Sequence, residues 1–400
     1  MHGPPAAPPV PTPSVSDLRG AARLAARTVV GVTDVVEAAH ATVARPVGRP
    51  RRTRGITGLV YRIIRAVTRG VGRLLDRGLG AVEPIAVPAE TPSVARDALV
   101  AALNGAFGDA LAADGNPLAT TAHLRHDGRA LDLDDLRRSV SDPSGVLLVQ
   151  VHGICMHDGQ WGTAAHDPGA VLADALGATR LAVRYNSGRH VVENGRDVAD
   201  LLDRAVRAWP VPVGRVVVVG HSMGGLVARS AFEAARVAGH DWPTRNAALI
   251  TLGTPHHGAP LERIGNAVDA LLGATRWGAP YARIGQARSA GVTDLRFGSV
   301  HDDDWKGSDR FERRPDTRRH VPLPESVACF FVAATTGDGR GGVRDRTLGD
   351  GLVPLDSALG LHTDPARTLA PCDRWTATGM THFDLLHRPE VTERLVAWLA

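Results

Sequence analysis

The chain has 400 residues, of which 44% are hydrophobic and 22% are charged, a composition typical of a globular protein with a sizeable core. The formal net charge of +4 at pH 7 is too small to indicate a nucleic-acid-binding protein. Cys155, Cys329 and Cys372 lie far apart without a CxxC or Cys/His spacing, so we expect neither a disulfide framework nor a zinc site.

Residues 1–13 are rich in proline and are predicted to form a disordered tail. They have neither the basic region nor the apolar region of a secretory signal. No later stretch offers about 18 uninterrupted apolar residues for a membrane span. We therefore expect a cytoplasmic protein.

A helical N-terminal region is predicted over residues 14–140. Residues 14–44 contain no internal proline and predict a first helix. The proline- and arginine-rich segment that follows ends this helix. A further helix is expected to follow Thr91-Pro92-Ser93 and to end near Ala113. After it, Asp127-Gly128 indicates a short β-hairpin.

Between these, residues 55–82 predict a helix with two distinct faces. Apolar residues recur at helical spacing on one face: Ile56, Leu59, Val60, Ile63, Ile64, Val67, Val71 and Leu74. Arginines step by three or four on the opposite face: Arg62, Arg65, Arg69, Arg73 and Arg77. The simpler interpretation is a surface helix packed on its own domain with solvated arginines. The alternative is an interfacial helix resting on an anionic membrane.

From residue 141 onward, short apolar runs alternate with helical patterns. The runs are 145–153, 179–186, 214–222, 247–255 and 327–336, and the helix candidates are 168–176, 194–208 and 223–238. Continuous apolar strands separated by helices predict an α/β fold with a mostly parallel, doubly wound sheet. Right-handed crossovers bring the carboxyl ends of its strands to one edge. Residues 256–325 contain no clear strand and predict an insertion at that edge.

Gly220, His221, Ser222, Met223 and Gly224 form a G-x-S-x-G pentapeptide between a predicted strand and a predicted helix. Small residues on both sides of the serine allow a sharp turn that exposes its hydroxyl in strained backbone geometry. The helix that follows directs backbone N–H groups towards a developing oxyanion. This context predicts a nucleophilic serine rather than an ordinary glycine-rich turn.

A nucleophilic serine needs a base and an acid that orients it, in the chain order serine, acid, histidine. Asp350 lies in a glycine-flanked loop after the last apolar run, and His382 precedes a predicted C-terminal helix. His387 is a second candidate base, but it lies within or at the end of the following turn. The other candidate acids are Asp338, Asp345 and Asp356.

Acyl transfer also needs two donors for the oxyanion. One is the backbone N–H of Met223, directly after the nucleophile. The loop after an early strand, His152-Gly153-Ile154, supplies the second, for which we predict the N–H of Ile154. Cys155 is the neighbouring alternative nucleophile, but it lacks the strand–turn–helix context and is interpreted as a small loop residue.

Five motifs occur in order: His152-Gly153-Ile154, Gly220–Gly225, "TLGTPHHG" at 251–258, "GDGLVP" at 349–354 and "THFDLL" at 381–386. Through them the chain resembles an α/β-hydrolase of the lipase/esterase branch. It is similar to bacterial triacylglycerol lipases and to glycosylphosphatidylinositol-deacylase-like hydrolases. The resemblance covers about 145–400 and leaves the N-terminal region unmatched. It implies a catalytic domain at 141–400 with a cap- or lid-like insertion at 256–325.

The resemblance further implies a carboxylic-ester hydrolase with Ser222, Asp350 and His382 as its triad. Its substrate is expected to be a small molecule, a lipid-like or other acyl ester, with no metal, organic cofactor or nucleic acid involved. The same residues also fit a thioesterase or an amidase, and a catalytically inactive binding module of this fold is the alternative outside enzymes. A scaffold whose N-terminal helices bind a partner is the least favoured hypothesis.

Overall fold

The computed structural model describes residues 14–44, 55–82, 94–163, 165–259, 288–307, 309–312, 315–337 and 349–399. The predicted tail at 1–13 and the segment 260–287 of the predicted insertion lie outside these residues. So do Asp338 and Asp345, two of the alternative acids.

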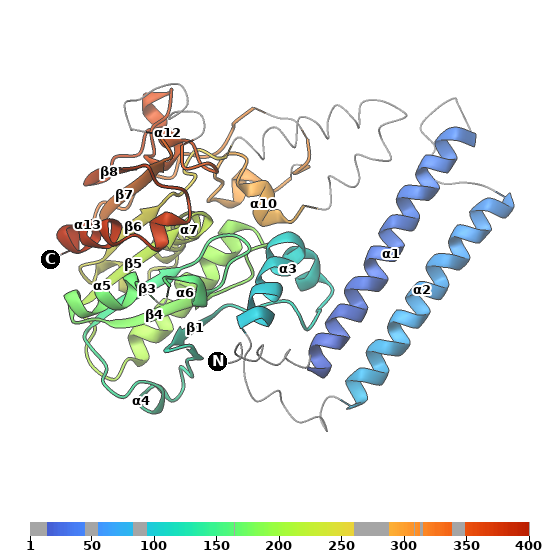
Figure 1. The fold of residues 1–400 in the computed structure, drawn as a ribbon, viewed down its shortest axis with the longest axis horizontal. Helices are drawn as coiled ribbons and strands as arrows, with labels where there is room; N and C mark the ends of the chain where they lie inside the picture. Colours follow the sequence, from blue (N-terminus) through green and yellow to red (C-terminus); the bar gives the residue numbers. More distant parts are fainter. Residues whose placement is uncertain are drawn as a thin grey trace, which may run out of the picture.

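An eight-stranded sheet runs through the molecule in the order β2-β1-β4-β3-β5-β6-β7-β8 (Figure 1). Its strands are β1 (His123–His126), β2 (Arg129–Ala130), β3 (Val146–Val151), β4 (Thr179–Arg184), β5 (Arg215–His221), β6 (Ala248–Leu252), β7 (Ala328–Thr335) and β8 (Asp373–Thr378). Strands β3 to β8 pair in parallel, whereas β1 is antiparallel to β2 and β4. The predicted mostly parallel sheet is confirmed, and each of the five apolar runs forms a strand.

Helices cover the sheet on both faces, as a doubly wound fold requires. They are α5 (Pro168–Leu176) and α13 (Pro389–Leu399) on one face, and α6 (Val191–Ala208) and α7 (Met223–Ala238) on the other. Side chains alternate between the faces of a strand, so Val216 and Val218 of β5 pack with α6 and α7. Val217 and Val219 join the opposite core. Burial on both sides explains the continuous valine run in the sequence.

Three longer helices precede the sheet, with the predicted bounds: α1 (Val15–Ala44), α2 (Gly55–Val82) and α3 (Val94–Ala113). Helices α1 and α2 form an antiparallel hairpin beside the rest of the molecule, with α2 as its outer helix (Figure 1). The hairpin is attached through α1. Arg23 donates to the carbonyl of Gly115 at 2.6 Å, and Asn116 donates to the carbonyl of Gly20 at 3.1 Å.

The sheet extends further in both directions than the apolar runs indicate. Strand β1 pairs with β4, so the sheet begins before residue 141, inside the predicted helical N-terminal region. Strand β8 forms the other edge of the sheet and is only half buried. Its sequence, DRWTAT, is therefore more polar than the buried strands and does not stand out as an apolar run.

The remaining elements are short, and no helix within the described residues has the length and apolar content needed to cross a bilayer. They are α4 (Leu136–Ser139), α10 (Ala290–Asp294), α12 (Leu355–Ala358) and the 3₁₀ turns η1 (Asp158–Gln160), η2 (Trp242–Thr244), η3 (Asp302–Asp304), η4 (Pro365–Arg367) and η5 (Asp384–Leu386). The described parts of the predicted insertion at 256–325 contain no strand, as expected.

Candidate active site

Ser222 occupies the turn between β5 and α7, with φ 54° and ψ −128°. Positive φ is strained for a residue with a side chain and persists only where neighbours fix it. Here the Ser222 N–H donates to the carbonyl of Leu252 at 2.8 Å. The Ser222 carbonyl accepts from Thr254 Oγ1 at 2.9 Å and from the Gly225 N–H at 3.1 Å. The end of β6, the loop after it and the first turn of α7 therefore hold the serine in its strained conformation.

The glycines around Ser222 are required by close backbone approach. A Cβ atom on Gly220 would lie 2.6 Å from the Cα of Gly225, and one on Gly224 would lie 2.1 Å from the carbonyl oxygen of Val151. Neither contact is sterically allowed, because these atoms belong to the backbone and cannot rotate away. The glycines thus let α7 start directly against β5 and β3, which sets the direction of the turn.

Asp350 and His382 come from the loops after β7 and β8 and form a buried pair. Asp350 Oδ2 lies 2.7 Å from His382 Nδ1. The other carboxylate oxygen accepts the backbone N–H groups of Leu352 at 2.9 Å and Val353 at 2.8 Å. With one oxygen held by two donors, the second is fixed towards the imidazole. This arrangement leaves His382 Nε2 as the ring nitrogen available for a reaction.

The pair lies next to the serine turn at the carboxyl edge of the sheet. His221, adjacent to Ser222, has Nε2 3.1 Å from the carbonyl oxygen of His382, and the two rings are 4.7 Å apart. A Cβ on Gly253, at the end of β6, would lie 3.1 Å from both Asp350 Oδ2 and His382 Cε1. The structure therefore brings the three residues predicted for the triad to one place.

The described alternatives for acid and base are placed differently. Asp356 is exposed on α12, whereas Asp350 is buried against His382. His387 follows the turn η5, and its Nδ1 has no hydrogen-bond partner among the described residues. The geometry thus favours Asp350 and His382 over these alternatives.

The loop after β3 lies directly against Ser222. A Cβ on Gly153 would be 3.0 Å from the Cβ of Ser222. Met223 is the first residue of α7, where helix N–H groups have no partner within the helix. Within the described part of the chain, the N–H groups of Met223 and Ile154 donate to no other residue. Two unused donors therefore lie on the residues predicted for the oxyanion hole.

His152 anchors this loop as a neutral ring. Its imidazole stacks on Tyr185 with 4.2 Å between ring centroids, and the Tyr185 hydroxyl donates to the His152 carbonyl at 2.6 Å. Complete burial lowers the pKa of His152 to about 4. The His152 ring thus supports the loop that carries Ile154, next to the candidate site.

This buried histidine predicts a loss of stability in mild acid. The unfolded chain binds a proton near pH 6.5, whereas the folded chain does so only near pH 4, so lowering the pH favours unfolding. Relative to acidic pH, His152 should contribute up to about 3 kcal/mol to the free energy of unfolding at neutral pH. This contribution is lost progressively as the pH falls from 6.5 to 4. Urea unfolding of the wild type and of His152→Gln at pH 7.5 and 4.5 measures this. Equal pH dependence in the two proteins would contradict it.

Cys155 is arranged as a structural loop residue. Its N–H donates to Ser187 Oγ at 3.1 Å, and a Cβ on Gly105 of α3 would lie 2.2 Å from its sulfur. Partial burial raises the pKa of the thiol, so the reactive thiolate is disfavoured at neutral pH. Its surroundings are unlike those of an activated cysteine nucleophile.

Two residues near the site are not singled out by the sequence pattern. Thr254 holds the Ser222 carbonyl, and its hydroxyl would lie 2.0 Å from a Cβ on Gly225. Phe383 is 51% exposed beside the pair, with its ring centroid 5.6 Å from that of His382. Thr254 lies within the motif "TLGTPHHG", and Phe383 directly follows His382 in the motif "THFDLL". Membership of these motifs is the sequence signal that could have identified them as site residues.

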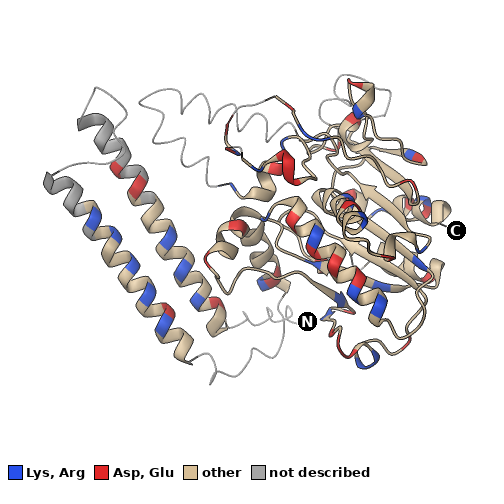
Figure 2. Ribbon diagram, turned by 180° about the vertical axis from the view of Figure 1, so that it is seen from behind, with Lys and Arg blue, Asp and Glu red and all other residues tan. Residues whose placement is uncertain are grey.

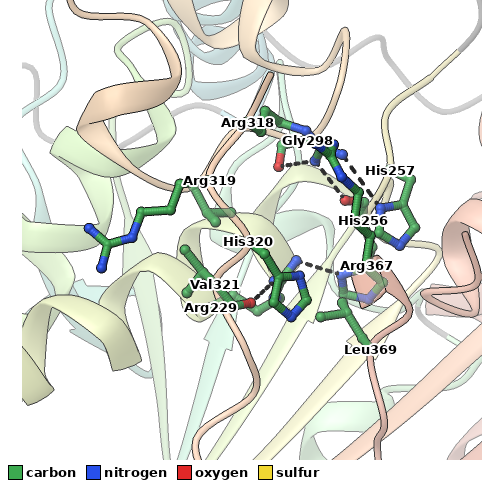
Figure 3. Close-up of a pocket in the computed structure, with 11 residues that line it drawn as sticks. Arg229, His256, His257, Gly298, Arg318, Arg319, His320, Val321, Arg367 and Leu369 are labelled. Atoms are coloured by element: carbon green, nitrogen blue, oxygen red, sulfur yellow. Dashed lines mark hydrogen bonds between the residues drawn. The ribbon is translucent and has the colours of Figure 1, made fainter. Parts of the chain in front are cut away.

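A small cavity lined by arginines and histidines lies beside α7 (Figure 3). Its basic lining residues are Arg229, His256, His257, Arg318, Arg319, His320 and Arg367. Arg229 is buried and donates to the carbonyl of Val321 at 2.9 Å, while Arg318 donates to the carbonyls of His256 and Gly298 and pairs with Asp316 at 2.9 Å. With a volume of about 20 Å³, the cavity has room for one water molecule. Arg229 and Arg318 brace the surrounding loops against α7.

Comparison with known proteins gives one family match and a set of related folds. The model of the PGAP1-like alpha/beta domain matches residues 187–306, a range that includes Ser222 but ends before Asp350 and His382. No curated protein sequence matches the chain.

The Bacillus licheniformis lipase BlEst2 is similar in its propeptide form, with 23% identity, 64% of this chain and 52% of that chain covered, and a TM-score of 0.42. Its mature form has 21% identity, 64% and 92% coverage and a TM-score of 0.40. A Pyrobaculum calidifontis esterase has 16% identity, 65% and 76% coverage and a TM-score of 0.35. The chain thus spans about half the length of the propeptide form.

The fold and the family match agree with the sequence motifs. The sheet is mostly parallel and covered by helices on both faces, and a strained serine turn connects β5 to α7. The helices α1 to α3 precede it. The chain has the α/β-hydrolase fold with an N-terminal helical extension, and residues 187–306 match the PGAP1-like alpha/beta domain.

Proposed function

We propose that the protein is a serine carboxylic-ester hydrolase that acts on lipid-like or other acyl esters through a covalent acyl-enzyme. The observation that supports this best is the strained Ser222 turn beside the buried Asp350–His382 pair. A serine hydroxyl becomes an effective nucleophile only with a positioned base, and the base needs a fixed orientation. All three elements lie at the edge where the strands of the sheet end.

In the proposed reaction, Ser222 Oγ attacks the ester carbonyl while His382 Nε2 removes its proton. Asp350 accepts the hydrogen bond from His382 Nδ1 and stabilises the imidazolium that forms. The carbonyl oxygen becomes an oxyanion that the N–H groups of Ile154 and Met223 bind. His382 then protonates the departing alcohol, which leaves an acyl group on Ser222.

Water completes the cycle by the same route in reverse. His382 Nε2 removes a proton from the water as its oxygen attacks the acyl carbon, and the second oxyanion forms between the same two donors. Collapse breaks the bond to Ser222 Oγ, returns the proton from His382 to that oxygen and releases the carboxylic acid. Apart from the ester and the water, each proton and each new bond in these steps is handled by a group of the chain itself.

The test combines covalent labelling with a substrate panel. A fluorophosphonate should label the full-length protein once, on the peptide that contains Ser222, and the protein should hydrolyse p-nitrophenyl esters. Higher kcat/KM on matched thioesters or amides would move the assignment to those classes. Failure of both labelling and hydrolysis would favour the inactive binding module instead. Esters of increasing acyl length then define the preferred chain.

A further inference from the structure

The outer helix α2 exposes a row of large apolar side chains. Ile64, Val67, Val71, Leu74 and Leu75 are between 38% and 73% exposed. At about 100° per residue they share one side of the helix. The simpler interpretation, in which the apolar stripe of this helix packs on the protein itself, is therefore wrong for Ile64, Val67, Val71 and Leu74. A contiguous exposed apolar row on a folded protein indicates a binding surface.

The row is exposed because α2 contacts α1 through a different, polar face. Arg65 is buried and pairs with Asp34 at 3.0 Å and with Glu37 at 2.5 Å. Near the other end, Asp76 binds Arg19 and Arg23. These ion pairs hold the hairpin together and leave the apolar row unused. The expectation of a solvated arginine at position 65 is also wrong, since that side chain is only 5% exposed.

Helix α1 carries a matching row on the same side of the hairpin. Leu18, Ala21, Ala25 and Val29 are exposed and recur at helical spacing. On both helices the apolar row is offset in the same rotational sense from the face that contacts the partner helix. Because the helices are antiparallel, equal offsets place both rows on one side of the pair. We name this side the apolar face.

Charge identifies the kind of surface that the apolar face suits. Residues 14–82 contain thirteen arginines and four acidic residues, a formal charge of +9. Since the whole chain carries +4, the rest of the molecule is −5. On α2, Arg69, Arg73 and Arg77 are exposed, and Figure 2 shows basic positions recurring along this helix. Positive charge is thus concentrated in the stretch of sequence that contains α1 and α2, whereas the rest of the chain carries net negative charge that an anionic surface would repel.

We propose that the apolar face of the α1–α2 hairpin docks on an anionic lipid bilayer. The helices lie in the interface with their apolar rows among the acyl chains, and the arginines add attraction to acidic head groups. A helix of this length covers about 40 Å of membrane surface. The proposal concerns binding and does not depend on the proposed ester hydrolysis.

The test is cosedimentation of the full-length protein with vesicles of phosphatidylcholine alone or with 30% phosphatidylglycerol, a composition chosen as roughly that of an anionic membrane. Wild type should bind the anionic vesicles at least about tenfold more tightly, and less tightly as salt rises. Val71→Gln/Leu74→Gln should weaken binding about tenfold or more, because two apolar side chains no longer enter the lipid. Arg73→Gln/Arg77→Gln should remove much of the preference for anionic lipid.

Matched controls replace side chains of similar exposure on the body of the molecule. Val171→Gln/Val237→Gln and Arg137→Gln/Arg138→Gln should bind as the wild type does. Far-UV circular dichroism and the urea unfolding midpoint should be the same in all five proteins, which shows that the variants are folded. Wild-type binding by the α2 apolar variant would overturn the proposal. So would concentration-dependent dimers that this variant alone abolishes without any vesicle binding, since the face would then be occupied by a second copy.

Discussion

Replacing Ser222 by alanine is expected to abolish ester hydrolysis, with kcat/KM falling by about 10⁴-fold or more. The substitution removes the oxygen that forms the acyl bond, and no neighbouring hydroxyl or thiolate among the described residues is placed to substitute for it. Cys155 packs against α3 with a raised thiol pKa. Only the rate enhancement from substrate binding and the oxyanion donors should remain.

Steady-state kinetics and fluorophosphonate labelling of Ser222→Ala measure this effect. Ser230→Ala is the matched control, because Ser230 is a buried serine on the same helix whose hydroxyl donates to the carbonyl of Val300 at 3.0 Å. The control should keep activity and labelling, although losing that bond costs about 1 kcal/mol of stability. Labelling that persists in Ser222→Ala but disappears in Cys155→Ala would show that the nucleophile is the cysteine.

Much of the fold follows from the sequence because its central strands are buried on both faces. A continuous apolar run such as that of β5 is typical of a strand in a covered parallel sheet when helical segments separate it from similar runs. The pattern fails at the sheet edges. Strand β8 is half buried and polar. The hairpin of β1 and β2 was predicted from Asp127-Gly128 and is confirmed, but its pairing with β4 was not predicted. The pairings of β1 with β4 and of β8 with β7 join segments that are remote in sequence, so a local pattern does not show them.

The residues of the candidate site could be named from the sequence because backbone constraints limit them. The glycines flanking Ser222 have no room for a side chain, so the motif records the geometry directly. The partner of His382 was harder to choose, since several aspartates follow β7. What distinguishes Asp350 is its pair of backbone donors, Leu352 and Val353, together with its burial. Such contacts depend on the folded loop and leave no periodic signal.

The α1–α2 hairpin shows a feature that the sequence pattern could not determine, which is the face of a helix that its neighbour covers. Its helices and its amphipathic pattern were predictable, but the pattern alone assigns the apolar stripe of a helix to a core. The ion pairs of Arg65 with Glu37 and of Asp76 with Arg23 reverse that assignment, because they place the charged residues in the helix contact. Which face of an amphipathic helix is covered depends on its partner helix.

Changing Asp350 to asparagine is expected to lower kcat/KM by about 10³- to 10⁴-fold while preserving the fold. The amide is isosteric, so its oxygen can still accept the N–H groups of Leu352 and Val353. Its NH₂ group then faces His382 Nδ1 and donates to it. That hydrogen bond favours the tautomer with the proton on Nε2, which cannot accept the proton of Ser222.

Because the nucleophile itself is intact, Asp350→Asn should differ from Ser222→Ala in a specific way. Fluorophosphonate should still react with Ser222, but at a rate reduced about as much as kcat/KM. The matched control is Asp356→Asn, which changes an exposed aspartate on α12 and should leave both rates unchanged. If Asp356→Asn lost activity and Asp350→Asn kept it, the acid of the triad would be assigned to α12. If instead Asp350→Asn alone reacts slowly, and still at Ser222, the Asp350 carboxylate is the group that orients His382, whose Nδ1 lies 2.7 Å from it.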